Sequence, residues 1–308
     1  CIFADIANKV IFITTDNGRN ISKVDLPFHP SEISFYDKSV SYALALDKID
    51  SKRQLWLTRD MGKTWFPIHE YVKAFFWSSA RPNSVLVERA EPNLKNTVIE
   101  LSLIHPEQWS RESKLVIDNI VDFEVRGDYM FATKSLPPAS VNETSKDLAL
   151  YMSYKNSPFV LAKFSTELVR RDYHICDVSH NRVFVAVSHS DTQANLYVSE
   201  GTGEWSATFY LSLEGILAFF PNTTWKGSWL NDVADEAFTD LYKVEGLKGI
   251  YIASQVKETP KGAIGPEHLV SKITFDHGAT WNRIKAPPVN HEGFYMHCTN
   301  DCSLHLSQ

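Results

Sequence analysis

The chain has 308 residues, of which 44% are hydrophobic, 12% aromatic and 22% charged, and its formal net charge is −6. This modest negative charge, spread along the chain, argues against a nucleic-acid groove or an anionic membrane surface as the partner. No apolar run approaches the roughly 18 residues of a membrane-spanning helix, so we expect no direct membrane contact in this segment. The chain begins in strand-like sequence without a signal peptide and stops abruptly, which predicts an internal piece of a longer protein.

Short segments in which apolar and polar residues alternate recur along the chain, and this period of two predicts β-strands. The segments are rich in Val, Ile, Phe and Tyr and are bounded by Asp, Asn, Gly, Ser and Pro. Long helical periodicity is absent from the sequence, and only residues 165–171 could hold a helical turn. The pattern predicts an all-β fold, either a sandwich, a barrel or a propeller. Clear predicted strands are residues 9–14, 40–46, 97–103, 129–133, 181–187 and 249–254.

An internal repeat favours the propeller among these all-β folds. Residues 58–65 and 274–281 share the pattern Ser/Thr-x-Asp-x-Gly-x-Thr-Trp, and residues 14–21 are a partial third copy. Weaker copies lie at 199–205 and 153–157. The spacing of the copies fits blades of roughly 40–50 residues, with some blades that carry no copy of the repeat. This repeat is known as an Asp-box. Its predicted residues are Thr14, Asp16, Gly18, Thr58, Asp60, Gly62, Trp65, Thr274, Asp276, Gly278 and Trp281.

The residue types of the Asp-box suit a hairpin turn better than they suit catalysis. An Asp side chain accepts hydrogen bonds from the N–H groups of a turn, Gly permits a positive φ, and Trp anchors the hairpin through apolar contacts. We therefore interpret Asp60 and Asp276 as structural residues and not as catalytic acids.

The cysteines and the glycosylation sequons favour an oxidising, lumenal compartment. Cys298 and Cys302 are separated by three residues, which fits a small loop disulfide. The alternative is half of a metal site, but the sequence offers no second Cys pair, so we predict the disulfide and no metal. Asn-x-Ser/Thr sequons occur at Asn20, Asn142 and Asn222.

Whole segments of the sequence resemble the sortilin-type family of sorting receptors, and within it most closely the sortilin-related receptors. The resemblance runs from near the first residue to the last residues and therefore covers essentially the whole chain. It is far more specific than any single motif. The segments that carry it are residues 52–65, 128–134, 183–190, 240–253, 273–281 and 302–306.

The resemblance implies a ten-bladed β-propeller in the ectodomain of a type I membrane receptor. With a length of about six blades, residues 1–308 would be an internal portion of that one domain, without a second domain. Such receptors bind peptides, propeptides and proproteins and carry them between the Golgi, the cell surface and endosomes. The resemblance thus implies a lumenal or extracellular ligand-binding domain that is no enzyme and needs no cofactor.

The family's peptide site carries over to this sequence only in part. One blade of sortilin-like members presents a Phe-Ala-Ser/Thr strand and the next an aromatic strand, and both have counterparts here. The matched residues are Phe131, Thr133, Tyr173, His174 and Ile175, and Lys146 is the cation nearest to the position of a carboxylate-binding Arg. We expect a ligand to add as a strand through its main chain. The alternative is that these side chains are ordinary blade packing.

The eleven histidines suggest in addition that ligand release depends on pH, because imidazoles change charge across the endosomal range. The candidates for this role are His174, His189 and His297.

Two other functional classes remain open from the sequence. Asp-boxed propellers also occur in sialidases and other glycosidases, but the Phe/Tyr-Arg-Ile-Pro signature and a visible Arg cluster are missing. A purely structural propeller that binds protein partners on its rim is the other alternative, and the Pro-rich stretches 137–138 and 287–288 would suit such a rim.

Overall fold

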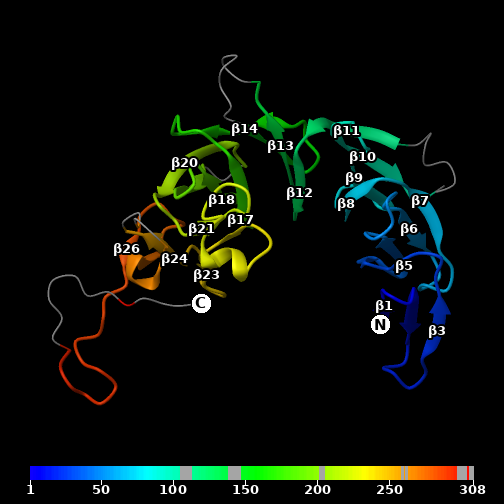
Figure 1. Cartoon of the computed structure of the whole chain (residues 1–308), viewed down its shortest axis with the longest axis horizontal. Coiled ribbons are helices and arrows are strands. Elements are labelled where there is room, and N and C mark those ends of the chain that lie inside the picture. The colour runs from blue at the N-terminus through cyan, green and yellow to red at the C-terminus, as the bar shows by residue number, and fades with distance from the viewer. Residues whose placement is uncertain are drawn as a thin grey trace. The chain divides into compact units, whose positions relative to one another are not determined.

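The computed structural model describes residues 1–104, 113–137, 147–200, 205–257, 260, 263–296 and 304. It has two compact parts: unit 1 comprises Cys1–Lys134 and Ser153–Phe159, and unit 2 comprises Ser135–Met152 and Val160–Gln308. Both consist of β-sheets, and the described residues contain no α-helix (Figure 1). The predicted all-β fold is therefore confirmed, and the succession of antiparallel sheets is propeller-like. Within the described ranges, no helix has the length and apolar character needed to cross a membrane.

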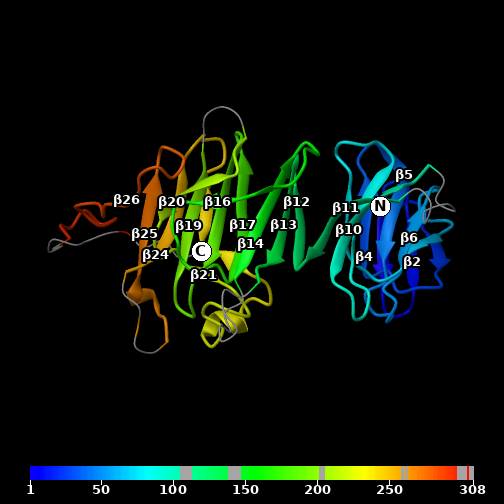
Figure 2. The ribbon, with the colours of Figure 1, turned by 90° about the horizontal axis from the view of Figure 1, so that it is seen from above.

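Unit 1 contains three sheets and a hairpin in which consecutive strands are hydrogen-bonded neighbours (Figure 2). Sheet A contains β1 (Ile2–Asp5), β2 (Val10–Ile13) and β3 (Ser22–Asp25). Sheet B contains β4 (Glu32–Tyr36), β5 (Ser39–Leu46), β6 (Leu55–Thr58) and β7 (Phe66–His69). Sheet C contains β8 (Val72–Trp77), β9 (Ser84–Arg89), β10 (Asn96–Ser102) and β11 (Ser113–Ile120). β12 (Asp122–Arg126) pairs with β13 (Tyr129–Ser135).

Unit 2 contains a hairpin and three sheets. β14 (Leu148–Tyr154) pairs with β15 (Val160–Leu161). Sheet E has the order β16 (Lys163–Phe164), β20 (Thr208–Leu213), β19 (Ala194–Ser199), β18 (Arg182–Ser188) and β17 (Asp172–Ser179). Sheet G pairs β21 (Ala218–Phe219) with β22 (Phe238–Thr239). Sheet F contains β23 (Leu241–Lys243), β24 (Tyr251–Val256), β25 (Leu269–Thr274) and β26 (Asn282–Arg283). Two short 3-10 helices, Trp229–Asp232 and Pro266–His268, lie between these strands.

The central strands are apolar along their length because both of their faces are covered. In β18 every side chain from Val183 to Val187 is fully buried. The sequence suggested a helical turn at residues 165–171, but no helical turn forms there. The Ser165 N–H instead donates to the Phe209 carbonyl at 2.9 Å, and this bond extends the pairing of β16 with β20. The six predicted strands are confirmed as β2, β5, β10, β13, β18 and β24.

The turn after Thr58 is held by its own side chains. The Thr58 hydroxyl donates to Asp60 Oδ1 at 2.9 Å and accepts from the Gly62 N–H at 2.8 Å. Asp60 also accepts from the Thr64 N–H at 2.8 Å and the Thr64 hydroxyl at 2.7 Å. Gly62 has a φ of +90°, a conformation that L side chains rarely adopt. The turn thus satisfies its polar groups internally while it joins β6 to β7.

Two further turns repeat these hydrogen bonds. Between β25 and β26, Asp276 accepts from the Thr274 hydroxyl and from the N–H and hydroxyl of Thr280, and the Gly278 N–H donates to Thr274 Oγ1. Between β2 and β3, Asp16 and Thr14 make the same bonds with Asn20 in the place of a threonine. The three predicted boxes therefore share one local geometry.

In two of the three turns the glycine lies against an earlier sheet, which is the three-stranded sheet A in one case and the five-stranded sheet E in the other. A Cβ added at Gly62 would lie 3.1 Å from the Cδ1 atoms of Ile2 and Ile11 in sheet A. A Cβ added at Gly278 would lie 2.6 Å from Ser212 Oγ and 2.8 Å from the Phe184 ring, both in sheet E. The Ser212 hydroxyl donates to the Gly278 carbonyl at 2.6 Å and so joins the two sheets.

Gly18, the third of these glycines, has no such neighbour, since a Cβ added there would meet nothing within 4 Å. On the same sheet Phe3 and Phe12 lie opposite each other and are 61% and 36% exposed. In sheet B the equivalent residues are Ala45 and Trp56, which lie opposite each other on neighbouring strands. Both belong to an apolar core that sheet B shares with sheet A. One face of sheet A therefore exposes the aromatic pair Phe3 and Phe12, with the charged and exposed Lys23 opposite Phe12.

Candidate functional site

Phe131 and Thr133, the first two predicted ligand-binding residues, lie on β13 in unit 1. The Phe131 side chain is 2% exposed, and its ring stacks on Tyr129 with 6.0 Å between the ring centroids. Thr133 is also buried, and its hydroxyl has no hydrogen-bond partner among the described residues. Phe131 thus belongs to the apolar interior, whereas Thr133 keeps an unused polar group.

Tyr173, His174 and Ile175 lie on β17 in unit 2. The Tyr173 hydroxyl donates to the Leu148 carbonyl at 2.7 Å, and burial raises the pKa of this phenol far above its usual value. His174 Nδ1 lies 2.8 Å from the Thr239 hydroxyl, and Ile175 is 4% exposed. All three side chains are thus engaged within unit 2. Lys146, predicted as a nearby cation, lies outside the described residues.

His189, one of the three candidates for pH-dependent release, is part of a buried network. His189 Nδ1 lies 2.7 Å from the Val169 carbonyl, so it carries a proton, and Nε2 accepts from the Tyr197 hydroxyl at 3.1 Å. Burial lowers the pKa of His189, which keeps the imidazole neutral. His297 lies outside the described residues.

The predicted modification sites are described only in part. Asn20 is exposed on the turn between β2 and β3, where its side chain donates to Asp16, and Asn222 is exposed in the turn that follows β21. Asn142, Cys298 and Cys302 lie outside the described residues. Within the part of the chain that the structure describes, no group of three or more His, Cys, Asp or Glu side chains is placed to hold a metal ion.

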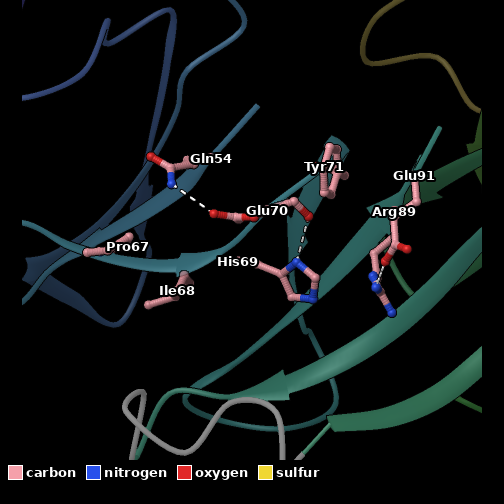
Figure 3. A pocket seen from close by; sticks show the side chains of 8 residues that line it. All are labelled: Gln54, Pro67, Ile68, His69, Glu70, Tyr71, Arg89 and Glu91. Carbon is pink, nitrogen blue, oxygen red and sulfur yellow. Dashed lines mark hydrogen bonds and ion pairs between the residues drawn. The ribbon is translucent and has the colours of Figure 1, made fainter. Parts of the chain in front are cut away.

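A pocket that the sequence did not predict opens in unit 1, where β7 of sheet B leads into β8 of sheet C (Figure 3). Its volume is about 340 Å³. The pocket is lined by Gln54, Pro67, Ile68, His69, Glu70, Tyr71, Arg89 and Glu91. These residues come from the position just before β6, from β7, from the β7–β8 connection, and from the end of β9 and the segment that follows it. No motif marks them, because they are brought together by the packing of two sheets.

The backbone around this pocket is held in place by Lys52 and Arg53. The Arg53 guanidinium donates to the carbonyls of Val72 at 2.8 Å and Lys73 at 3.1 Å. The Tyr71 N–H donates to the Lys52 carbonyl at 2.5 Å, and Tyr71 has a φ of +56°. A bulky residue in this conformation is uncommon. These hydrogen bonds therefore fix the backbone of the β7–β8 connection beside the pocket.

The charges of the pocket are paired. Arg89 forms an ion pair with Glu91, and Glu70 accepts from Gln54 and Lys52 at 3.2 Å each, which lowers the Glu70 pKa. His69 is 4% exposed and its Nδ1 lies 2.7 Å from the Glu70 carbonyl, so this nitrogen carries the proton. Burial, with the nearby Arg89 charge, lowers the His69 pKa and keeps the ring neutral.

Comparison with known proteins gives a match over the entire chain. The family described as "Sortilin, neurotensin receptor 3" matches residues 1–308. The chain is 34% identical to the human sortilin-related receptor over 312 aligned residues, which cover 100% of this chain and 14% of that receptor. It is 26% identical to the human VPS10 domain-containing receptor SorCS3, with 96% of this chain and 22% of that receptor covered.

The likeness to the solved structures compared is weak. The tricorn protease superposes with a TM-score of 0.47 at 9% identity, over 88% of this chain and 28% of that one. A likeness of this size supports no conclusion about function.

Proposed function

Because this chain belongs to the sortilin (Vps10) family of receptors, we propose that it is part of the ligand-binding ectodomain of a type I sorting receptor. The receptor would bind peptides, propeptides or proproteins on the lumenal or extracellular side and carry them between the Golgi, the cell surface and endosomes. The observation that carries the proposal is the match of the family to every part of the chain, at 34% identity to a sortilin-related receptor. The chain spans only 14% and 22% of the length of the two receptors compared, so the ligands and the route are inferred from the family.

Residues 1–308 would form an internal stretch of about six blades in one ten-bladed propeller. The box turns support this proposal, because those of sheets B and F join their third strand to their fourth and lie against an earlier sheet of the same unit. If the turn of sheet A is aligned with the other two, its β1, β2 and β3 take the places of the second, third and fourth strands. Sheet A then lacks the first strand of a blade.

The proposed ligand site comprises the β13 and β17 residues Phe131, Thr133, Tyr173, His174 and Ile175, with Lys146 nearby in sequence. Thr133 is the member with an unused polar group, because its buried hydroxyl has no partner among the described residues, and a ligand would reach this hydroxyl only after a local rearrangement of β13. Since the other side chains are buried or already bonded, the ligand would contribute mainly its own backbone, as an added strand.

Peptides selected from a random display library on the immobilised chain test this function. We expect the selected peptides to be extended and to lose at least about tenfold in affinity when alternate backbone nitrogens are methylated, because methylation removes ladder hydrogen bonds. Thr133→Val should weaken binding, whereas Thr15→Val, on an exposed turn, is the matched control. Failure to select any peptide, or affinities that ignore methylation, would contradict the proposal.

The predicted modifications belong to the same proposal. A lumenal domain would carry glycans on Asn20, Asn142 and Asn222 and a Cys298–Cys302 disulfide. Peptide mapping by mass spectrometry of the chain secreted from animal cells, with and without reduction, checks each of the four positions. Reduced Cys298 and Cys302 together with unmodified sequons would contradict the lumenal assignment.

A further inference from the structure

Four basic side chains gather in unit 2, where three hairpin turns meet. His277 lies in the box turn between β25 and β26, and its N–H donates to the Gly249 carbonyl of the β23–β24 turn at 3.0 Å. The His180 ring, in the β17–β18 turn, makes an edge contact with the His277 ring, with 6.0 Å between the ring centroids. Arg182 begins β18 directly after this turn, and Lys248 directly precedes Gly249.

The charges of these side chains act on one another. Burial lowers the pKa of His277, and the positive charges of Arg182, His180 and Lys248 lower it further, whereas Asp276 raises it. Interactions of this kind weaken with distance, so all four basic groups lie close together. The cluster therefore concentrates positive charge at one end of sheets E and F.

The carboxylates beside the cluster are already engaged. Asp276 accepts the hydrogen bonds of its own box turn, as described above. Asp177 on β17 accepts from the Tyr251 hydroxyl at 2.7 Å and lies 3.8 Å from the Lys243 ammonium. Neither carboxylate forms an ion pair with Arg182 or Lys248.

The two permanent cations of the cluster are left without a counter-charge. The Arg182 side chain is half-buried and Lys248 is exposed. Neither side chain has a hydrogen bond or an ion pair with another residue in the described part of the chain. Unpaired positive groups gathered in this way attract an anion.

We propose that His180, Arg182, Lys248 and His277 bind acidic side chains of a peptide ligand. Arg182 and Lys248 supply the permanent charges, and the planar guanidinium matches a carboxylate with two parallel hydrogen bonds. The two imidazoles add N–H donors whose charge increases as the pH falls. The inference rests on the proposed function in taking the ligand to be a peptide.

A short acidic segment fits this cluster better than a sulfated polysaccharide. An extended polyanion needs cations along a line, whereas acidic residues border this cluster on two sides. Glu245 is exposed three positions before Lys248 in the same turn, and Asp276 is exposed next to His277. These carboxylates would repel the parts of a long polyanion that extend beyond the cluster.

Binding at this cluster should become stronger as the pH falls, which is the opposite of acid-induced release. An anion stabilises the charged form of His180 and His277, so their protonation and its binding favour each other. Asp276, with a pKa of about 2, stays ionised at pH 5.5, and so does most of a ligand glutamate, with a pKa of about 4.3. We expect at least about threefold tighter binding at pH 5.5 than at pH 7.5.

The test uses the full chain with isotope-labelled histidine and follows the ring resonances of His180 and His277 by NMR. Each signal is identified by its loss in His180→Asn or His277→Asn, because asparagine tolerates the positive φ of both positions. The probes are the blocked peptides acetyl-Gly-Glu-Glu-Gly-N-methylamide and acetyl-Gly-Gln-Gln-Gly-N-methylamide. We expect the Glu peptide to shift both signals and to bind at least about tenfold more tightly than the Gln peptide at pH 5.5.

Removal of the permanent charges gives the sharper result. Arg182→Gln combined with Lys248→Gln should weaken binding of the Glu peptide at least about tenfold. Arg171→Gln combined with Lys226→Gln is the matched control, because it removes the same two charges from other surface positions of unit 2. The control should change the affinity less than about twofold. An unchanged backbone spectrum shows that each variant is folded.

The histidines are tested by the double variant His180→Asn with His277→Asn. It should lose the gain in affinity at pH 5.5, because the imidazoles that take up protons are gone. A gain that persists in this variant, or no gain in the native chain, would overturn the inference.

Three further outcomes would also overturn it: histidine signals that ignore the Glu peptide, equal affinities for the two peptides, or equal losses in the charge variant and its control. A disulfated disaccharide of equal charge that binds more tightly than the Glu peptide would overturn the assignment to a peptide. Failure here leaves the library selection on the β13 and β17 residues unaffected, because that experiment uses another site. Conversely, a chain that binds the Glu peptide at this cluster but yields no strand-forming ligands would contradict the proposed function alone.

Discussion

The turns at Gly62 and Gly18 have the same internal hydrogen bonds but different surroundings. Each has a threonine hydroxyl bridging an aspartate and the glycine N–H, and each glycine has a positive φ. Gly62 lies against the isoleucines of the preceding sheet, whereas Gly18 meets nothing. The comparison separates two roles of one motif: its side chains shape the turn, while its glycine lets a neighbouring sheet approach.

The largest effect should come from Gly278→Ala. The added methyl group would overlap the Phe184 ring and Ser212, and the alanine would be held at a φ of +81°. Backbone strain and overpacking together should lower the free energy of unfolding of unit 2 by about 3 kcal/mol. Urea unfolding followed by tryptophan fluorescence measures this loss. A loss below about 1 kcal/mol would show that sheet E yields without strain.

Gly62→Ala should destabilise unit 1 by about 2 kcal/mol, less than its counterpart in unit 2. Its methyl group would meet only the mobile ends of Ile2, Ile11 and Ile13, at 3.1 to 3.2 Å, and these can move by a few tenths of an ångström. The double variant Gly62→Ala with Ile11→Val provides the check. We expect the double variant to lose less free energy of unfolding than the sum of the losses from the two single changes. Strictly additive losses would count against direct contact between the two side chains.

Gly18→Ala should lower the free energy of unfolding by only about 1 kcal/mol, because backbone strain at a φ of +85° is its sole consequence. The same urea titration measures it. Equal losses at Gly18, Gly62 and Gly278 would mean that neighbouring sheets contribute nothing and that the comparison above is wrong.

The smallest effect concerns pH. Burial acts to raise the pKa of Asp276, but hydrogen bonds from Thr280 and Thr274 outweigh it and lower this pKa from 3.8 to about 2. The carboxylate therefore stabilises the fold fully above pH 3.8, and this contribution disappears as the pH falls toward 2. Because the side chain is largely solvated, we expect less than about 1 kcal/mol. The stability difference between the native chain and Asp276→Asn should shrink over this range, and a constant difference would contradict the assignment.

Much of the fold is predictable from the sequence because strand alternation and box turns depend on residues close together in the chain. The strand 181–187 and the Thr274–Gly278 turn are examples. The parallel pairing of β16 with β20 is not predictable in this way, since it joins segments more than forty residues apart (Lys163 with Thr208).

The candidate sites are less predictable than the fold. The β17 residues follow from the family resemblance, but the Tyr173 bond to the Leu148 carbonyl depends on packing within unit 2. The unit 1 pocket has no sequence signal at all, because Gln54, His69 and Arg89 become neighbours only when sheets B and C meet. The positive φ of Tyr71 is equally invisible, as nothing in its residue type favours that conformation.

The exposed pair Phe3 and Phe12 on sheet A has a practical consequence for handling the isolated chain. The two side chains lie opposite each other on a sheet whose edge strand β1 has, among the described residues, one side without a strand partner. Such a surface promotes colloidal attraction between copies, which limits the concentration that a purified sample can reach. Replacing Phe3 by Lys should raise that solubility limit without loss of stability, because the side chain touches water and not the core.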